Sequence, residues 1–254
     1  MYTEKMHKND KIKIVILAAG KGTRMKSELP KALVKLQGKH MIKHLLESVD
    51  KISLNSKPIV VVGYERELVM KELGDKYEYV IQEEQLGTGH AVMVAENACK
   101  NAENIIVISG DQPFLKSETI EKLWEKHKNS NATITITTTI LPDYEDWRKA
   151  FLTYGRIMRI DGKIIDKEIK DCTEEELRIK EVNVSCYAFK TEWLWDKLKK
   201  LDKNSNSQKE YQLTDLWQIA GNEGEKIESI QVDASETLGV NSKEELELLE
   251  KLVK

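Results

Sequence analysis

The segment from Leu17 to Met25 combines glycines and cations in a way that suits phosphate groups. It reads Leu-Ala-Ala-Gly-Lys-Gly-Thr-Arg-Met, and Glu28 is the one acid between positions 21 and 31. The bases in that interval outnumber it: Lys21, Arg24, Lys26 and Lys31. Backbone N–H groups and cations together can hold a polyanion. Taken alone the segment could be a solvated loop, but its position after a first buried strand favours a ligand site.

Two common phosphate-binding patterns do not fit this segment. Met25 stands where a dinucleotide fingerprint needs its third glycine, and no Gly-Lys-Ser/Thr closes a Walker loop. Farther on, Pro30 holds the backbone extended and fixes where Lys31 emerges. A lysine ammonium is a compact charge that suits phosphate oxygens. The pattern therefore predicts phosphate binding of another kind.

Other chemistry-bearing residues favour simpler interpretations. His40 and His44 are four apart and could present two imidazoles to a metal, but the sequence places no third ligand near them. We expect them on the surface at a helix entry. Three tryptophans could form a stacking platform, but their helical spacing among leucines favours core packing: Trp193, Trp195 and Trp217.

The elements that must position these residues alternate through the first half of the chain. Apolar runs predict buried strands, and apolar residues at helical spacing predict helices between them. The expected strands are 12–19, 58–62, 79–82 and 104–109, and the expected helices are 41–52, 65–73, 87–99 and 117–127, with Ser117 as N-cap. This alternation is typical of βαβ units on a parallel sheet.

The second half is patterned differently. Residues 132–140 alternate Ile with Thr, which predicts a strand with one solvated face. Asp161-Gly162 predicts a tight hairpin between its flanking strands. The remaining expected elements are strands 156–160, 163–167, 182–189 and 227–232, and helices 192–201, 213–220 and 242–253, the last capped by Ser242; 204–208 is expected to be a loop.

Composition excludes several classes of protein. The 254 residues carry 40 Lys plus Arg and 43 Asp plus Glu, a net charge of −3, which gives no bulk electrostatic reason to bind nucleic acid or membrane. No apolar run reaches membrane-spanning length, and residues 1–10 are too polar for a secretory signal. Three widely spaced cysteines, Cys99, Cys172 and Cys186, argue against a disulfide framework. We expect a cytoplasmic protein.

Taken together, the motifs resemble those of sugar-1-phosphate nucleotidyltransferases, and most closely N-acetylglucosamine-1-phosphate uridylyltransferases. The first loop with Leu29-Pro30-Lys31 is similar to the family signature, and the other motifs follow in the family's order over the whole chain after residue 11. These are Gln82, Gln85-Leu86-Gly87-Thr88-Gly89-His90-Ala91, Gly110-Asp111-x-Pro113, Tyr154-Gly155-Arg156-Ile157, Glu168, Glu181-x-Asn183, Tyr211-x-x-Thr214-Asp215 and Gly239-Val240-Asn241.

The resemblance implies an α/β fold: a doubly wound, mostly parallel mixed sheet with helices on both faces. It implies one nucleotidyltransferase domain, with a polar extension over 1–10, a nucleotide-binding half over about 11–130 and a sugar-binding half over about 131–254. Bifunctional members continue into a hexapeptide-repeat β-helix with acetyltransferase activity. No such repeats occur up to residue 254, so we expect the uridylyltransferase activity alone.

The resemblance also implies roles for individual residues. Arg24 and Lys31 would be catalytic, Asp111 and Asn241 would hold Mg²⁺, and the substrates would be UTP and a sugar 1-phosphate. A glutamine amide offers a donor and an acceptor to uracil, Glu168 and Asn183 suit an N-acetylated sugar, and Gly155 would leave room for that sugar. The implied substrate-binding residues are Leu17, Ala18, Ala19, Gly20, Lys31, Gln82, Gly87, Thr88, Ser109, Gly110, Asp111, Gly155, Glu168, Asn183 and Asn241.

Some positions depart from the family pattern. Ser109 stands where Tyr is frequent, Val184-Ser185 follow Asn183 in place of Thr-Gly, and Gln112 and Phe114 flank the Asp111 motif. The sugar side departs more than the nucleotide side, so another sugar phosphate is an alternative. A guanylyl- or cytidylyltransferase and a catalytically inactive nucleotide-sugar-binding protein are further alternatives. The Gly87–Ala91 segment disfavours the former, and the presence of Arg24, Lys31 and Asp111 disfavours the latter.

Overall fold

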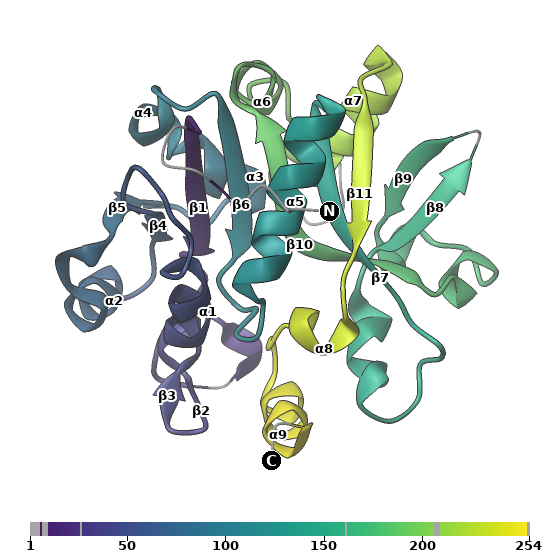
Figure 1. Ribbon diagram of the computed structural model, residues 1–254. Coiled ribbons are helices and arrows are strands. Elements are labelled where there is room, and N and C mark those ends of the chain that lie inside the picture. The colour runs from purple at the N-terminus through teal and green to yellow at the C-terminus, as the bar shows by residue number, and fades with distance from the viewer. Residues whose placement is uncertain (1–5, 7–9, 26, 161, 206–208, 253–254) are drawn as a thin grey trace.

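The computed structural model describes residues 6, 10–25, 27–160, 162–205 and 209–252. At its centre lies a nine-stranded sheet in the order β11-β7-β10-β6-β1-β4-β5, to which the β8–β9 hairpin is attached through β10 (Figure 1). Its strands are β1 (Ile12–Ala18), β4 (Ile59–Val62), β5 (Glu78–Ile81), β6 (Asn104–Ser109), β7 (Ile134–Ile140), β8 (Arg156–Ile160), β9 (Lys163–Lys167), β10 (Glu181–Lys190) and β11 (Ile227–Gln231). A separate small hairpin joins β2 (Lys35–Leu36) to β3 (Lys39–His40), which the sequence pattern did not predict.

The sheet is mixed, as expected. β1 pairs in parallel with both β4 and β6, β5 extends this side in parallel, and β11 runs parallel to β7. β10 is antiparallel to both β6 and β7 and joins the two parallel parts. The fold class predicted from the sequence is therefore confirmed.

Helices cover both faces of the sheet. Alternate side chains of β1 enter opposite cores, Ile14 and Ile16 on one face and Val15 on the other. The first face packs against α1 (Met41–Val49), α2 (Arg66–Leu73) and α5 (Ser117–Ser130), and the second against α3 (Thr88–Met93), α4 (Glu96–Cys99), α6 (Thr191–Leu198) and α7 (Asp215–Glu223). Parallel strands that are buried on both faces explain the continuous apolar runs in the first half.

The prediction of a solvated face on β7 is wrong. Six of its seven residues are buried, because the second core covers the face with Ile134 and Ile136, and α5 covers the face with Thr135, which contacts His127. Thr137 is accommodated by hydrogen bonds: its Oγ1 donates to the carbonyl oxygens of Val184 and, at 2.9 Å, Cys186. These acceptors lie where the pairing of β7 with β10 shifts register between Asn183 and Tyr187. A hydroxyl can be buried at small cost when it has such a partner.

Two helix predictions also need correction. The expected helix over 87–99 is two short helices, α3 and α4, separated at Ala95, whose N–H donates to Val92 O three residues back. The N-cap of α5 is Lys116, not Ser117, whose hydroxyl donates instead to Glu118. The turn at Asp161, the loop at 206–208 and the helix end at residue 253 lie outside the described residues.

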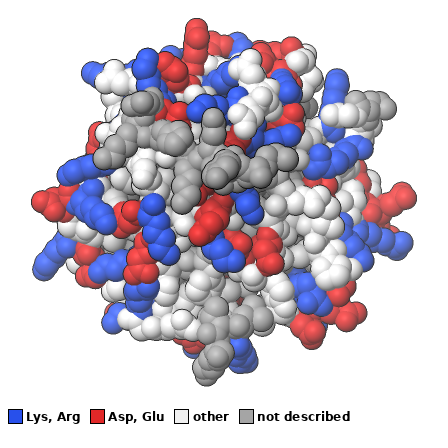
Figure 2. Space-filling view, in the orientation of Figure 1, with Lys and Arg blue, Asp and Glu red and all other residues white. Residues whose placement is uncertain are grey.

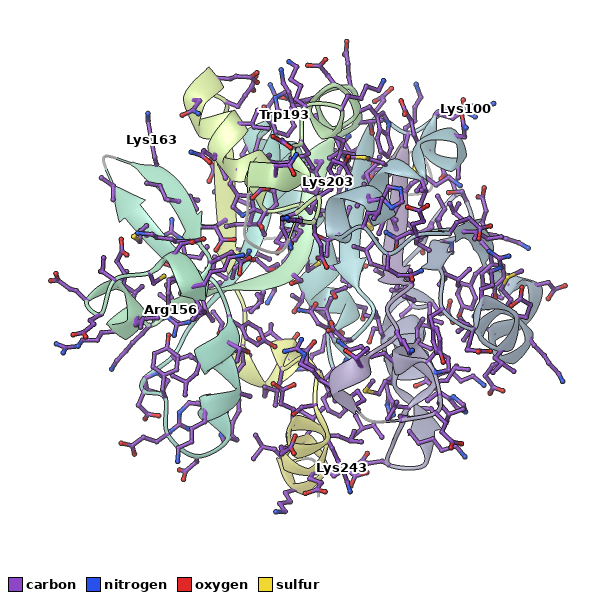
Figure 3. All side chains as sticks on the ribbon, turned by 180° about the vertical axis from the view of Figure 1, so that it is seen from behind. Lys100, Arg156, Lys163, Trp193, Lys203 and Lys243 are labelled. Carbon is purple, nitrogen blue, oxygen red and sulfur yellow. The ribbon has the colours of Figure 1, made fainter. Side chains whose placement is uncertain are left out.

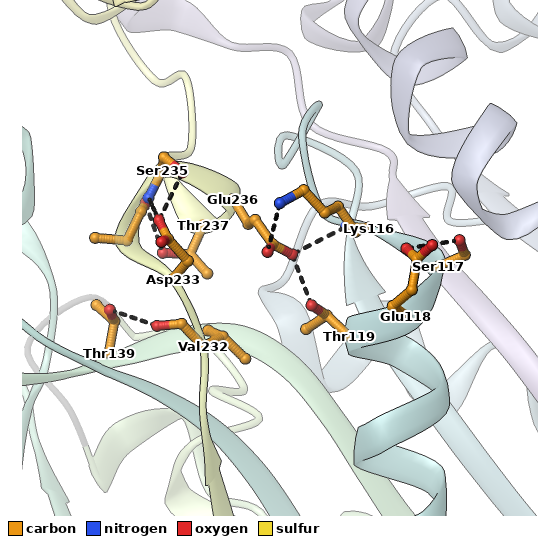
Figure 4. Close-up of polar contacts among 11 residues, drawn as sticks. Lys116, Ser117, Glu118, Thr119, Thr139, Val232, Asp233, Ser235, Glu236 and Thr237 are labelled. Carbon is orange, nitrogen blue, oxygen red and sulfur yellow. Dashed lines mark hydrogen bonds and ion pairs between the residues drawn. The ribbon is translucent and has the colours of Figure 1, made fainter. Parts of the chain in front are cut away.

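The C-terminal part of the chain returns to the centre of the molecule. From β11 it passes through α8 (Ala234–Thr237) to α9 (Lys243–Leu252). Asp233 caps α8 by accepting from Ser235 N at 2.8 Å. Glu236 accepts from Thr119 Oγ1 at 2.6 Å and from Lys116 Nζ at 3.0 Å, which ties α8 to the start of α5 (Figure 4).

The surface carries both signs of charge. Figure 2 shows Lys and Arg interspersed with Asp and Glu on the face it displays, with no large region of one sign. Within the described residues, no helix is both long and apolar enough to cross a membrane.

Candidate active site

The first loop and Asp111 lie at the same edge of the sheet. The carboxyl ends of β1 and β6 are adjacent, and Gly110 N donates to Leu17 O at 2.9 Å. A Cβ on Gly110 would lie 2.7 Å from that oxygen, so only glycine allows this approach. In parallel α/β sheets, ligands bind at this edge.

Three site residues from distant parts of the sequence meet in one cluster. Lys31 Nζ lies 2.5 Å from Asp111 Oδ2 and 2.6 Å from Asn241 Oδ1. Burial would raise the pKa of Asp111, but the Lys31 charge and hydrogen bonds from Lys31 and Ser109 outweigh it, so this pKa lies below its usual value. The two oxygens thus converge on a position that already holds a cation.

Backbone contacts explain how Asn241 reaches Asp111. Val240 N donates to Asp111 O at 3.1 Å, and Gly239 N donates to the Tyr154 hydroxyl at 2.7 Å. Glu245 closes a capping box at α9: its N–H donates to Ser242 Oγ at 3.2 Å, and its Oε2 accepts from Ser242 N at 3.1 Å. The prediction that Ser242 caps this helix is confirmed.

A first cavity of about 400 Å³ opens beside this cluster. It collects every predicted site residue from the nucleotide side: Leu17, Ala18, Ala19, Gly20, Arg24, Lys31, Gln82, Gly87, Thr88, Ser109, Gly110, Asp111 and Asn241. The Arg24 guanidinium is exposed, and the described residues provide no hydrogen-bond or ion-pair partner for it. A cation held without a partner at a cavity wall is available to an anionic ligand.

Gln82 uses part of its hydrogen-bonding capacity inside the protein. Its side chain is 3% exposed, and its Nε2 donates to Gly87 O and contacts His90 Nδ1, both at 3.1 Å. We expected the Gln82 amide to offer both a donor and an acceptor to a base. Because Nε2 is already used, only the acceptor Oε1 remains for a ligand. Gly87 has φ +106°, and a Cβ there would lie 2.6 Å from Tyr211 O. The close approach that requires glycine is thus to the chain around Tyr211.

A second cavity of about 320 Å³ adjoins the first. It collects the predicted residues of the sugar side, Gly155, Glu168 and Asn183. Six residues line both cavities: Leu17, Arg24, Thr88, Ser109, Asp111 and Asn241. The boundary between the two cavities therefore passes by Arg24 and by Asp111 and Asn241 of the central cluster.

The second cavity also contains residues that the sequence motifs did not single out. Asp166 accepts from Asn183 Nδ2 at 2.7 Å, and Tyr187 donates to Asn183 Oδ1 at 2.9 Å. A Cβ on Gly155 would lie 2.5 Å from Asp166 Oδ1, so this glycine makes room for the Asp166 carboxyl group. Asp166 was detectable only as a carboxylate two residues before Glu168. The first cavity is also lined by Gln85, which a motif includes but to which no role was assigned, and by Glu210, which no motif includes.

Burial perturbs the acids of the second cavity. It raises the pKa of Asp166 to about 7; the hydrogen bond from Asn183 opposes this rise, and the negative charges of Glu168 and Asp215 add to it. Burial likewise raises the pKa of Glu168. Arg24 is the only base that lines this cavity within the described part of the chain.

Arg156, from the Tyr154–Ile157 motif, is structural. It is 1% exposed, and its guanidinium donates to the carbonyl oxygens of Tyr154 (2.5 Å) and Phe151 (3.3 Å). Figure 3 shows it at the base of the β8–β9 hairpin, whose outer end carries Lys163. It therefore anchors the hairpin that forms one wall of the second cavity.

The histidine pair and the three tryptophans that the sequence analysis considered have structural contacts. His44 Nε2 is bonded to Leu36 O at 3.0 Å, and His40 Nε2 lies 3.7 Å from Glu72. Trp217 is 2% exposed and packs against Tyr187 in the second core, while Trp193 and Trp195 are partly buried there, so core packing is confirmed. Among the residues that the structure describes, no three His, Cys, Asp or Glu side chains form a group able to hold a metal.

The family model of the MobA-like NTP transferase domain matches residues 14–156, more than half of the chain. The chain belongs to this family. It is therefore a nucleotidyltransferase, and the matched region includes the first loop, Lys31, Gln82 and Asp111.

Comparison with curated proteins agrees with this family assignment. The chain is 42% identical over 243 residues to the bifunctional protein GlmU of Clostridium beijerinckii, covering 94% of this chain and 51% of that protein. It is 41% identical over 233 residues to GlmU of Limosilactobacillus reuteri, covering 90% and 49%. The chain thus spans about half the length of the curated relatives it matches.

Solved structures share the fold. A chain from Bacillus anthracis assigned as a glucose-1-phosphate thymidylyltransferase superposes with a TM-score of 0.71 at 18% identity, covering 95% of this chain and 94% of the other. A CMP:2-keto-3-deoxy-manno-octonic acid synthetase gives a TM-score of 0.68 at 19% identity, covering 96% and 98%. Both support the sheet topology described above.

Proposed function

We propose that this nucleotidyltransferase transfers a uridylyl group from UTP to N-acetylglucosamine 1-phosphate, forming UDP-N-acetylglucosamine and pyrophosphate. The observation that carries the proposal is the pair of adjoining cavities that meet at Arg24, Asp111 and Asn241. A nucleotide in the first cavity and a sugar phosphate in the second would bring their phosphates together there. The motif order and the similarity to GlmU proteins support this choice of substrates.

The reaction needs no protein nucleophile. A phosphate oxygen of the sugar 1-phosphate attacks the α-phosphorus of UTP, a new P–O bond forms, and the bond to the β-phosphate breaks to release pyrophosphate. Both reactants are polyanions, so neutralising charge and aligning the groups are the main tasks. Arg24 would brace the transferring and leaving phosphates, and Lys31 would hold the α-phosphate or the incoming sugar phosphate.

The donor set at the cluster fits magnesium. Asp111 provides a carboxylate oxygen and Asn241 an amide oxygen, and the two converge on one cation position. Mg²⁺ is commonly held by one or two protein oxygens, with phosphates and water completing its shell. When bound, the ion would supply charge neutralisation for the phosphates, and these two residues would hold it.

The first cavity supports recognition of uracil. Gln82 Oε1 would accept from N3–H of the base, and the backbone N–H of Gly87 would donate to O4. Cytosine reverses both positions, because it lacks the N3 proton and carries an amino group at C4. Leaving buried polar groups unpaired costs about 1–3 kcal/mol each, so UTP would exceed CTP by roughly 10²-fold in kcat/KM.

The two halves of the chain would divide the substrates between them. Residues from about 11–130 supply most of the first cavity, and Gly155, Glu168 and Asn183 of the second half supply the sugar side. Glu168 would accept from sugar hydroxyls, and the Asn183 amide would pair with the acetamido group. Asn241 crosses from the second half to complete the cluster.

A panel of nucleotides and sugar phosphates tests the proposal. Pyrophosphate release would be measured with UTP, CTP, GTP and dTTP against N-acetylglucosamine 1-phosphate, glucosamine 1-phosphate and glucose 1-phosphate. The proposal predicts the highest kcat/KM for UTP with N-acetylglucosamine 1-phosphate. A preference for CTP would overturn the uridine assignment, whereas a preference for another sugar would overturn only the sugar.

A further inference from the structure

Asp166 belongs to a chain of hydrogen bonds that crosses two elements of the second cavity. It lies on β9 and accepts through Oδ2 from Asn183 Nδ2 of β10 at 2.7 Å. Asn183 Oδ1 in turn accepts from the Tyr187 hydroxyl at 2.9 Å. Both ends of the Asn183 amide are therefore occupied once by protein groups.

The two partners of Asn183 differ in what they determine. A tyrosine hydroxyl both donates and accepts, so Tyr187 could pair with either end of the amide. Above its pKa of about 7 the Asp166 carboxylate only accepts, so in its ionised form Asp166 can pair with the NH₂ end alone. The Asp166 carboxylate is thus the group that fixes which end of the Asn183 amide lies on which side.

This arrangement leaves part of the hydrogen-bonding capacity of Asn183 for a ligand. A side-chain amide has two N–H donors and two oxygen lone pairs. With one donor given to Asp166 and one lone pair to Tyr187, Asn183 retains one N–H and one lone pair. An acetamido group has a carbonyl oxygen and an N–H, which match this remainder.

The position of Asp166 is unfavourable for an ionised carboxyl group. The Oδ1 atom is buried and has no hydrogen-bond partner among the described residues. It lies where only a glycine at position 155 leaves room, since a Cβ there would be 2.5 Å away. Burial raises the pKa of this carboxyl group to about 7. Buried polar groups without partners are uncommon and cluster at sites that serve a function.

We propose that Asp166 is a positioning residue of the sugar subsite, which fixes the Asn183 amide so that one N–H and one oxygen lone pair remain for the acetamido group of the substrate. This inference rests on the proposed function. Asp166 acts through Asn183, so its effect should fall on the sugar phosphate and not on the nucleotide.

Four variants test the coupling: Asp166→Ala, Asp166→Asn, Asn183→Ala and the double variant Asp166→Ala/Asn183→Ala. Steady-state kinetics at pH 8, above the Asp166 pKa of about 7, would give KM for N-acetylglucosamine 1-phosphate and for UTP separately. We expect Asp166→Ala to raise KM for the sugar phosphate about tenfold and to leave KM for UTP within twofold. Asp166→Asn offers a donor as well as an acceptor, so it can pair with either end of the Asn183 amide and should restore KM for the sugar phosphate only in part, to between about threefold and tenfold of the wild-type value.

The double variant distinguishes positioning from an independent contact. If Asp166 acts through Asn183, adding Asp166→Ala to Asn183→Ala changes KM for the sugar phosphate by less than about twofold. Glu174→Ala is the matched control, because this exposed carboxylate lies in the segment that follows β9 but does not line the second cavity. It should leave both KM values unchanged, and thermal unfolding of each variant would detect a general loss of folding.

Specific outcomes would overturn the inference. One is an unchanged KM for the sugar phosphate in Asp166→Ala while Asn183→Ala raises it. Another is an equal effect of Asp166→Ala with and without Asn183, or an equal rise in both KM values. By contrast, a wild-type protein that does not use N-acetylglucosamine 1-phosphate with UTP would overturn the proposed function itself.

Discussion

Single residues at this site combine in ways that a motif cannot express. Lys31, Asp111 and Asn241 each match a motif, and the structure brings their charged and polar atoms within hydrogen-bond distance. Asp166 matches none, because its importance depends on Asn183 and Gly155, which are distant in the sequence. Sequence patterns can therefore predict residue types at a site, but they do not predict which partner occupies each atom.

Arg24 gives the first prediction at this scale. Removing one preorganised cation from a phosphate-transfer site costs about 10²–10³ in rate, so Arg24→Ala should lose about that much kcat. Its melting temperature should not change, because the exposed guanidinium has no protein partner within the described residues. Arg66→Ala is the control, since Arg66 pairs with Glu83 outside both cavities. Near-normal turnover of Arg24→Ala would remove Arg24 from the mechanism.

Asp166 gives a second prediction, on stability and pH. Its pKa in the fold is about 7, against an ordinary value of 3.8. Between these values the folded chain holds a proton that the unfolded chain has lost, so the free energy of unfolding falls as pH rises from about 4 to about 7. Asp166→Asn removes this cost and should raise the melting temperature by several degrees at pH 8, and by less at pH 5.

Calorimetric or fluorescence melting at both pH values would measure this difference. Asp171→Asn serves as the control, because this carboxyl group is exposed. If Asp166→Asn raises the melting temperature equally at pH 5 and pH 8, then ionisation of buried Asp166 does not destabilise the fold, and this prediction is wrong.

At the scale of elements, the strands and helices were more predictable than their environments. β6 matches its predicted range, and β1 and β4 differ by one residue, because buried parallel strands leave uninterrupted apolar runs. β7 was assigned correctly as a strand but wrongly as half-solvated, since helix and loop cover its threonines: Thr135 contacts His127 of α5, and Thr139 donates to Val232 O. Alternation of Ile and Thr indicates a strand, but whether each face of the strand is buried depends on the helices and loops that pack against it.

The loop before α3 gives the third prediction. Gly87 has φ +106°, and a Cβ there would lie 2.6 Å from Tyr211 O. Gly87→Ala should therefore destabilise the protein by about 1–3 kcal/mol and raise KM for UTP. Gly221→Ala is the matched control, because it lies within α7 with open space around it and should stabilise by up to about 1 kcal/mol. Equal melting temperatures for the two variants would contradict this interpretation.

At the scale of the whole molecule, the fold joins the two cavities through one cluster. β10 reverses direction between two parallel parts of the sheet, and the chain after β11 returns through α8 to place Asn241 beside Asp111. The sequence supported the class of sheet, because the alternation of strands and helices is a local signal. It could not predict this return path, which depends on contacts such as that of Glu236 with Thr119.

The cluster gives the fourth prediction, on metal dependence. Asp111 provides the only carboxylate that contacts the cation position within the described residues, so Asp111→Asn should abolish Mg²⁺-supported activity. Asn241→Ala should raise the Mg²⁺ concentration needed for half-maximal rate with a smaller loss. Titration of MgCl₂ after treatment with EDTA would measure both. Full activity in EDTA, or unchanged metal dependence in Asp111→Asn, would count against these ligands.

A crystal structure of the protein with UDP-N-acetylglucosamine would test the proposed function most strictly. We expect the uracil ring in the first cavity, with N3 within hydrogen-bond distance of Gln82 Oε1. We expect the acetamido group in the second cavity beside Asn183, and the diphosphate near Arg24 and Asp111. A ligand with its sugar in the first cavity, or bound away from both cavities, would overturn the assignment of the two cavities.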